Sequence, residues 1–192
     1  MMKKGKPAGP TGIVSEMFMA DEDCGVEWLT SLCNLTVDQG RNPDDWRSSI
    51  LLPVFKGKGN LMECGSYRVK LLEHAMKVIE HVFERKIREK VKIDAMQLLY
   101  FAFVDLEKAF DRVPREVTRW ALRKAGVDER LVKVVMAMYE GAQTVVRTIE
   151  GDSKAFNVKI GLHQGSVLSP LLFVIVMEMI SRELRAVLPQ MN

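Results

Sequence analysis

The clearest hydrophobic pattern in the chain is helical and falls in residues 67–91. Apolar residues recur there at intervals of three and four, namely Leu72, Met76, Ile79, Phe83, Ile87 and Val91. Charged residues fill the other face, with Glu73 four positions before Lys77 and Glu84 four positions before Arg88. The pattern predicts one long amphipathic helix whose charges pair with one another.

A second pattern, apolar or aromatic at every position, runs from Leu98 to Val104 and stops at Asp105. An unbroken run of this kind is typical of a strand buried on both faces of its sheet. The strand would hold the carboxylate of Asp105 at the edge of the sheet, where a metal ligand or a catalytic acid is well positioned. An aspartate after a strand is also a common turn former or helix N-cap, and the pattern alone leaves that alternative open.

The remaining patterns are shorter. Residues 1–10 are basic and rich in glycine and proline, which predicts a flexible entry to the fold, and Thr11 is expected to cap a short helix. In the helix expected over residues 115–125, the side chains of Val117, Trp120 and Ala121 are expected to face inward. Helices are expected over residues 26–38, 115–125 and 171–180 and after Asp128, and strands over residues 50–54, 144–149 and 156–160. Together these elements predict an α+β fold.

Composition narrows the class of protein only modestly. Hydrophobic residues make up 47% of the 192 residues, and the net charge of +3 permits a polyanionic partner without requiring one. The three cysteines, Cys24, Cys33 and Cys64, show no CxxC spacing, so the sequence suggests neither a zinc site nor a disulfide framework. No apolar segment is long enough to cross a bilayer, and we therefore expect a soluble intracellular chain with no membrane partner.

A turn rich in glycine and lysine follows the first expected strand, at residues 56–59. Backbone amides and the ammonium groups of Lys56 and Lys58 would share one volume there, which suits a phosphate group. The turn lacks the flanking sequence of a P-loop, and a hairpin tip with solubilising lysines is the alternative.

Two runs carry a family resemblance. The run Asp105–Pro114 (DLEKAFDRVP) resembles the first catalytic motif of reverse transcriptases, in the form found in non-long-terminal-repeat (LINE-like) retrotransposons. The run Gly161–Phe173 (GLHQGSVLSPLLF) is similar to the second palm motif of the same family. Upstream, Pro10–Gly12, Trp46 and Tyr67–Arg68 match its fingers region, so the resemblance extends over nearly the whole chain.

The resemblance implies an α+β fold, a partial right-hand polymerase with an antiparallel palm sheet packed on helices. Residues 11–97 would be fingers-like and residues 98–192 palm-like. The sequence departs from the family pattern in two places. The glycine-rich template-contacting motif of relatives is missing after Gln97, and the chain stops before the Tyr-Ala-Asp-Asp hairpin, so we expect a truncated domain.

By the same resemblance, Asp105 would be the catalytic carboxylate. Together with the backbone carbonyl of Leu106 it would bind Mg²⁺, with Mn²⁺ as the alternative ion, in two-metal nucleotidyl transfer. His163 could be a further ligand or simply a hydrogen-bonded neighbour. The implied substrate-binding residues are Phe110 under the deoxyribose, Gln164 and Gly165 along the nascent base pair, and Lys56 and Arg68 near the triphosphate or template.

The implied function is that of an RNA-directed DNA polymerase acting on an RNA template, a DNA primer and deoxynucleoside triphosphates. Because Asp105 alone offers one carboxylate to a site built for two dications, we expect these 192 residues not to extend a primer at a useful rate. Two other classes stay open: a catalytically dead nucleic-acid-binding remnant, and a fragment that serves only as a protein-interaction surface. A basic groove would favour the first, and exposed apolar faces would favour the second.

Overall fold

A computed structural model of the chain describes residues 5–20, 22–55, 57, 60, 62, 66–91 and 108–187. The elements follow one another as α1 (Ser15–Met19), α2 (Glu22–Gln39), the 3-10 helix η1 (Asp44–Arg47), β1 (Ser48–Phe55), β2 (Tyr67–Leu71), α3 (His74–Lys90), α4 (Ala109–Arg112), α5 (Arg115–Lys124), α6 (Glu129–Ala137), β3 (Gln143–Thr148), β4 (Gly151–Asp152), β5 (Phe156–Asn157) and α7 (Ser169–Val187). This mixture of helices and a sheet confirms the α+β class.

The described sheet is mixed, because β1 and β2 join it from outside the region for which the resemblance implied an antiparallel sheet. β1 pairs antiparallel with β2 and parallel with β3, and β3 pairs antiparallel with β4 and β5. Parallel neighbours require a long crossover, and α3, α5 and α6 lie in the chain between β1 and β3. A buried contact of 2.8 Å between Ser49 Oγ and Thr144 Oγ1 joins these two strands. The strand expected at residues 98–104 lies outside the described residues.

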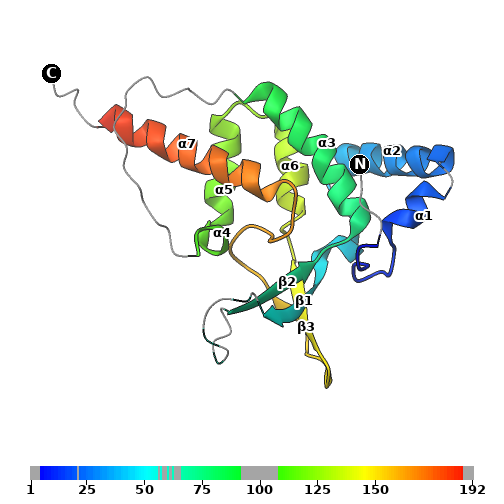
Figure 1. The fold of residues 1–192 in the computed structure, drawn as a ribbon. Helices are drawn as coiled ribbons and strands as arrows, with labels where there is room; N and C mark the ends of the chain where they lie inside the picture. The colour runs from blue at the N-terminus through cyan, green and yellow to red at the C-terminus, as the bar shows by residue number, and fades with distance from the viewer. Residues whose placement is uncertain are drawn as a thin grey trace.

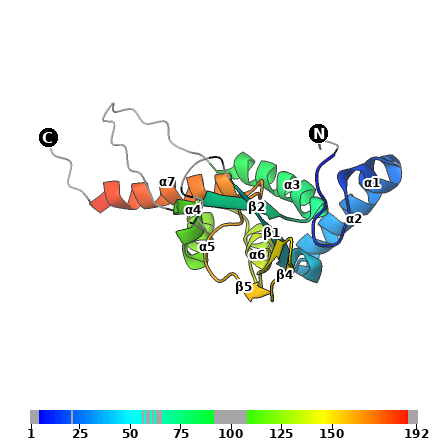
Figure 2. The ribbon, with the colours of Figure 1, turned by 60° about the horizontal axis from the view of Figure 1, so that its bottom comes forward.

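Helices α3, α5, α6 and α7 gather on one side of the sheet (Figure 1). Both views place α1 and α2 at the end of the molecule opposite the C-terminal end of α7 (Figure 1, Figure 2). The core lies between the four gathered helices, where apolar side chains such as Phe83, Leu122, Val135 and Leu172 are almost completely buried. No helix in the described ranges is long and apolar enough to cross a membrane.

The long helix predicted over residues 67–91 is correct only from His74 onward. Residues Tyr67–Leu71 form β2 instead, because they pair with β1 in the register Ile50 to Leu71. A partner strand that supplies hydrogen bonds overrides a weak local helical pattern. The predicted ion pair between Glu84 and Arg88 is present on the exposed side of α3.

The short helices around α5 begin and end largely as predicted. Pro114 is the N-cap of α5, Gly126 follows its end at φ +78°, and the side chain of Asp128 accepts a hydrogen bond from Arg130 N at the start of α6. The expectation that Trp120 faces inward is wrong, since this side chain is 38% exposed. The buried stripe of α5 consists of Thr118, Ala121 and Leu122, one position further round the helix.

Thr11 does not cap α1, which begins at Ser15 after Val14. Its N–H and Oγ1 instead donate to the carboxylate of Glu73, at 2.7 Å each. In the same region His74 Nε2 donates to Pro7 O at 3.0 Å. These bonds tie the described part of the N-terminal segment to the start of α3, while the flexibility expected of residues 1–10 stays a prediction.

The hairpin predicted before Gln164 is present but shorter than expected. β3 covers most of its predicted strand, whereas only Phe156–Asn157 of the strand expected at 156–160 pairs with it. The side chains of Phe156 and Ile160 are exposed, so no second layer stabilises a longer strand there.

Candidate functional site

The loop that leads into α7 lies against the segment that contains α4. Leu162 N donates to Phe110 O at 2.8 Å, and Gly161 N donates to Val113 O at 3.0 Å. Gly161 has φ +89°, and a Cβ added to it would meet Asp111 O at 2.6 Å. The close backbone approach therefore requires glycine at this position.

The side chain of Gln164 reaches across this contact. Its Nε2 donates to Asp111 Oδ1 at 2.7 Å, between residues 53 positions apart in the sequence. The next residue, Gly165, has φ +81°, and an added Cβ would lie 3.3 Å from Lys70 O on β2. The loop thus touches α4 on one side and β2 on the other.

Phe110 faces the first turns of α7. Its ring stacks on that of Phe173, with centroids 4.6 Å apart and an interplanar angle of 22°. Both rings are partly buried against the core. An aromatic pair of this geometry holds α4 on α7 and so fixes one wall of the site.

The site has a positive, partly buried side formed by Lys70 and Arg115. Burial, followed by the charge of Arg115, lowers the pKa of Lys70 to about 8, and the carboxylate of Asp111 opposes this shift. Arg115 donates a hydrogen bond to Val158 O, and its guanidinium carbon Cζ lies 5.8 Å from the ring centroid of Tyr139. An anionic ligand would be stabilised beside these two cations.

His163 is buried and neutral. Burial, then the charges of Lys70 and Arg115, lower the pKa of His163 to about 3. Its ring packs on Tyr139 at a centroid distance of 4.4 Å, and neither ring nitrogen finds a hydrogen-bond partner in the part of the chain that is described. No group of three or more His, Cys, Asp or Glu suitable for a metal occurs in that part either. The role of His163 as a ligand stays a prediction, since Asp105 lies outside the described residues.

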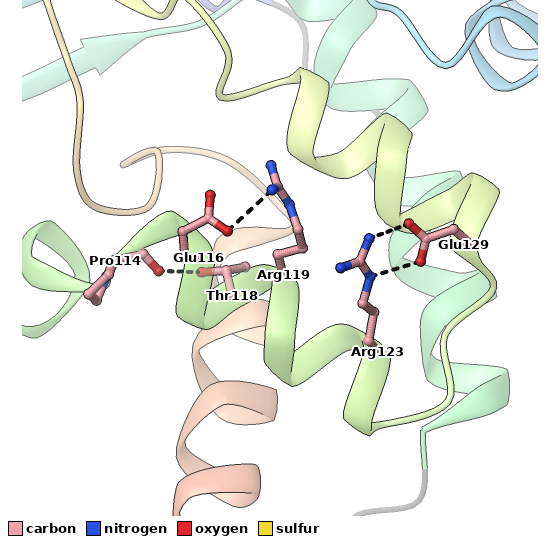
Figure 3. Close-up of polar contacts among 6 residues, drawn as sticks. All are labelled: Pro114, Glu116, Thr118, Arg119, Arg123 and Glu129. Atoms are coloured by element: carbon pink, nitrogen blue, oxygen red, sulfur yellow. Dashed lines mark hydrogen bonds and ion pairs between the residues drawn. The ribbon is translucent and has the colours of Figure 1, made fainter.

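A cavity of about 440 Å³ lies between α5, α6 and the end of α2, and it shares only Arg115 with the candidate-site residues described above. Its lining includes four cationic side chains, but two of them are already paired. Arg123 binds Glu129 through two bonds of 2.9 and 2.5 Å, and Arg119 binds Glu116 at 3.2 Å (Figure 3). The lining contains neither Asp111 nor Gln164, so we place the candidate site at the loop and not in this cavity.

Of the residues singled out in the sequence, the structure brings together Phe110, Gln164 and Gly165. Arg68 belongs to β2, two positions before Lys70. Lys56, Asp105 and Leu106 lie outside the described residues. Sequence reasoning missed Lys70, although its spacing from Arg68 was a usable signal.

Comparison with known proteins identifies the family. Residues 55–190 match the family model described as reverse transcriptase (RNA-dependent DNA polymerase). The chain belongs to the reverse transcriptase family. This match includes both motif runs and confirms the family assignment made from them.

Two retrotransposon polyproteins are similar to this reverse transcriptase domain. The Pol polyprotein of the type-1 retrotransposable element R2 of Nasonia vitripennis is 22% identical over 94% of the chain. That of the type-2 element R2DM of Drosophila melanogaster is 35% identical over 44% of the chain. The chain spans 20% and 8% of their respective lengths. These relatives confirm the non-long-terminal-repeat type of reverse transcriptase.

The contact between Gln164 and Asp111 should be measurable as a coupling between the two motifs. In a double-mutant cycle of Gln164→Ala and Asp111→Ala, we expect an interaction energy of about 1 kcal/mol in urea unfolding. Asp111→Ala combined with Glu27→Ala, on the exposed face of α2, is the control and should be additive. Additivity in both cycles would contradict the contact.

Proposed function

We propose that the chain forms the fingers and part of the palm of an RNA-directed DNA polymerase that acts on an RNA template and a DNA primer. Residues 11–97 would serve as fingers and residues 98–192 as palm, in a partial right-hand arrangement. Gln164 and Gly165 would lie along the nascent base pair, and Phe110 would contact the deoxyribose. Lys56 and Arg68 would meet the triphosphate or the template.

The bond between Gln164 Nε2 and Asp111 Oδ1 carries this proposal. It joins the two runs that resemble catalytic motifs, and the backbone bond from Leu162 N to Phe110 O supports the same approach. Lys70 and Arg115 add positive charge beside the loop, which suits a substrate that carries phosphates. Two runs that bind the same nucleotide must lie side by side, as these two do.

Asp105 and Leu106 would hold the divalent metal ions. A carboxylate and a backbone carbonyl are oxygen ligands, which Mg²⁺ prefers. Bound metal would lower the pKa of the primer hydroxyl and stabilise the transferred phosphoryl group. The part of this chain's own residues would be to position the base pair and to offset the negative charge of the phosphates.

The proposal is tested by binding, because the 192 residues contain no Tyr-Ala-Asp-Asp sequence that would support extension. A labelled RNA–DNA hybrid with a recessed DNA 3′ end is titrated by fluorescence anisotropy at about 50 and about 200 mM salt. We expect weak binding whose affinity falls as salt rises. With Mg²⁺, the complementary deoxynucleoside triphosphate should tighten binding more than a mismatched one.

Matched variants assign the effect to the site. Asp105→Asn should abolish the response to the complementary nucleotide, whereas Asp38→Asn, on the exposed side of α2, should retain it. Affinity independent of salt, or an equal response to matched and mismatched nucleotides, would rule out a polymerase-like mode of binding.

A further inference from the structure

Glu80 is a buried carboxyl group that lies outside both motif runs. It lies on the core side of α3 and is 1% exposed. Its Oε1 accepts a hydrogen bond from Ser166 Oγ at 2.7 Å, and its Oε2 accepts one from Val167 N at 3.0 Å. Burial of a carboxyl group costs free energy that hydrogen bonds must offset, and here both offsetting donors come from the loop after Gly165.

Hydrogen bonds within residues 163–169 also hold this loop together. Ser166 Oγ accepts from the backbone N–H groups of Leu168 and Ser169, at 3.2 and 3.3 Å. Ser169 Oγ in turn donates to His163 O at 2.7 Å. A chain of hydrogen bonds therefore leads from Glu80 through two serines to the residue before Gln164, and such networks restrict a loop to one conformation.

We propose that Glu80 is a positioning residue that holds the loop of residues 163–167 so that Gln164 reaches Asp111 and faces the nucleotide. The inference rests on the proposed function for its link to substrate, because the described hydrogen bonds of the Glu80 side chain go to the loop. Its helix belongs to the fingers-like region and the loop to the palm-like region. Glu80 thus couples the conformation of the substrate loop to α3.

The protonation of Glu80 gives this role a measurable signature. Burial raises the pKa of Glu80 to about 7 from its ordinary value of 4.5, while its bonds to Ser166 and Val167 and the charge of Lys77 oppose the shift. The charge of Glu80 in turn raises the pKa of the buried Tyr139, which follows α6. Burial outweighs the effects that oppose it at Glu80, so the closed structure favours the protonated form. Closure is therefore most stable below pH 4.5 and loses stability as pH rises to about 7.

Amide hydrogen exchange at Val167, Leu168 and Ser169 reports on the closed loop, because these three N–H groups are bonded within the network. After correction for intrinsic exchange, we expect the opening constant of the parent to rise by roughly tenfold per pH unit between its two pKa values. Above about pH 7 the opening constant should level off.

Three variants separate positioning from simple packing. Glu80→Gln keeps the shape but cannot titrate, so its opening constant should be independent of pH. Glu80→Ala removes both acceptors and should speed exchange about 10- to 100-fold. Glu89→Gln, on the exposed side of the same helix, should behave as the parent does. A pH dependence that persists in Glu80→Gln would overturn the proposal.

The binding assay then tests the link to substrate. Between about pH 4.5 and pH 7, below the pKa of Lys70, the response to the complementary nucleotide should weaken with rising pH in the parent and stay constant in Glu80→Gln. If exchange becomes independent of pH in Glu80→Gln but the nucleotide response still changes as in the parent, Glu80 does not position the loop for substrate. Absence of hybrid binding by the parent at every pH would refute the proposed function, whereas amide exchange would still decide whether Glu80 fixes the loop.

Discussion

Gly161→Ala is expected to destabilise the protein by about 3–5 kcal/mol, which makes it one of the two most damaging substitutions considered. Gly161 has φ +89°, a conformation that costs other residues free energy. Its new Cβ would also lie 2.6 Å from the backbone oxygen of Asp111. A backbone atom cannot rotate aside, so the loop must leave α4 and give up the bonds from Gly161 N and Leu162 N.

Gly126→Ala provides the matched control for the backbone conformation. Gly126 has φ +78°, but nothing lies within 4 Å of an added Cβ. It should therefore lose only about 1 kcal/mol. Urea unfolding of the two variants separates steric clash from backbone strain. Equal losses of stability in both would contradict the close approach of the loop to Asp111.

Phe83→Ala is expected to cost a similar amount, about 3–5 kcal/mol, for a different reason. The ring of Phe83 is 2% exposed on the core face of α3. Its removal gives up buried apolar area and leaves a cavity that the packed helices cannot fill. The midpoint of urea unfolding should fall accordingly.

The neighbouring Val82→Ala is the control for Phe83→Ala. Val82 lies on the same turn of α3 but is 43% exposed. Its truncation should change stability by no more than about 0.5 kcal/mol. A loss in Phe83→Ala no larger than that in Val82→Ala would mean that α3 does not pack on the core through this face.

Helical periodicity predicted α3 well because its apolar stripe is decided by neighbours three and four residues away. The same reasoning failed at Tyr67–Leu71, where pairing with β1 decides the conformation and no local signal reports it. Trp120 was expected to face inward together with Val117 and Ala121, whereas the orientation of α5 on α7, a tertiary property, leaves it 38% exposed.

The candidate site, too, could be predicted from the sequence only in part. Gln164 and Gly165 could be recognised because a motif resemblance carries them, but the partner of Gln164 depends on how α4 approaches the loop. Glu80 was not singled out in the sequence. Its position four residues after Met76 and three before Phe83 places it on the apolar stripe, and an acid there was the signal that a buried donor must exist.

The parallel pairing of β1 with β3 has a consequence for synthesis of the chain. Ser49 and Thr144 are 95 residues apart, so β1 and β2 leave the ribosome long before the strand that completes their sheet. Until then one edge of β1 carries unpaired N–H and C=O groups, which can template wrong pairing. The residues of β1 therefore acquire their full set of backbone partners only after β3 has been translated, almost one hundred residues later.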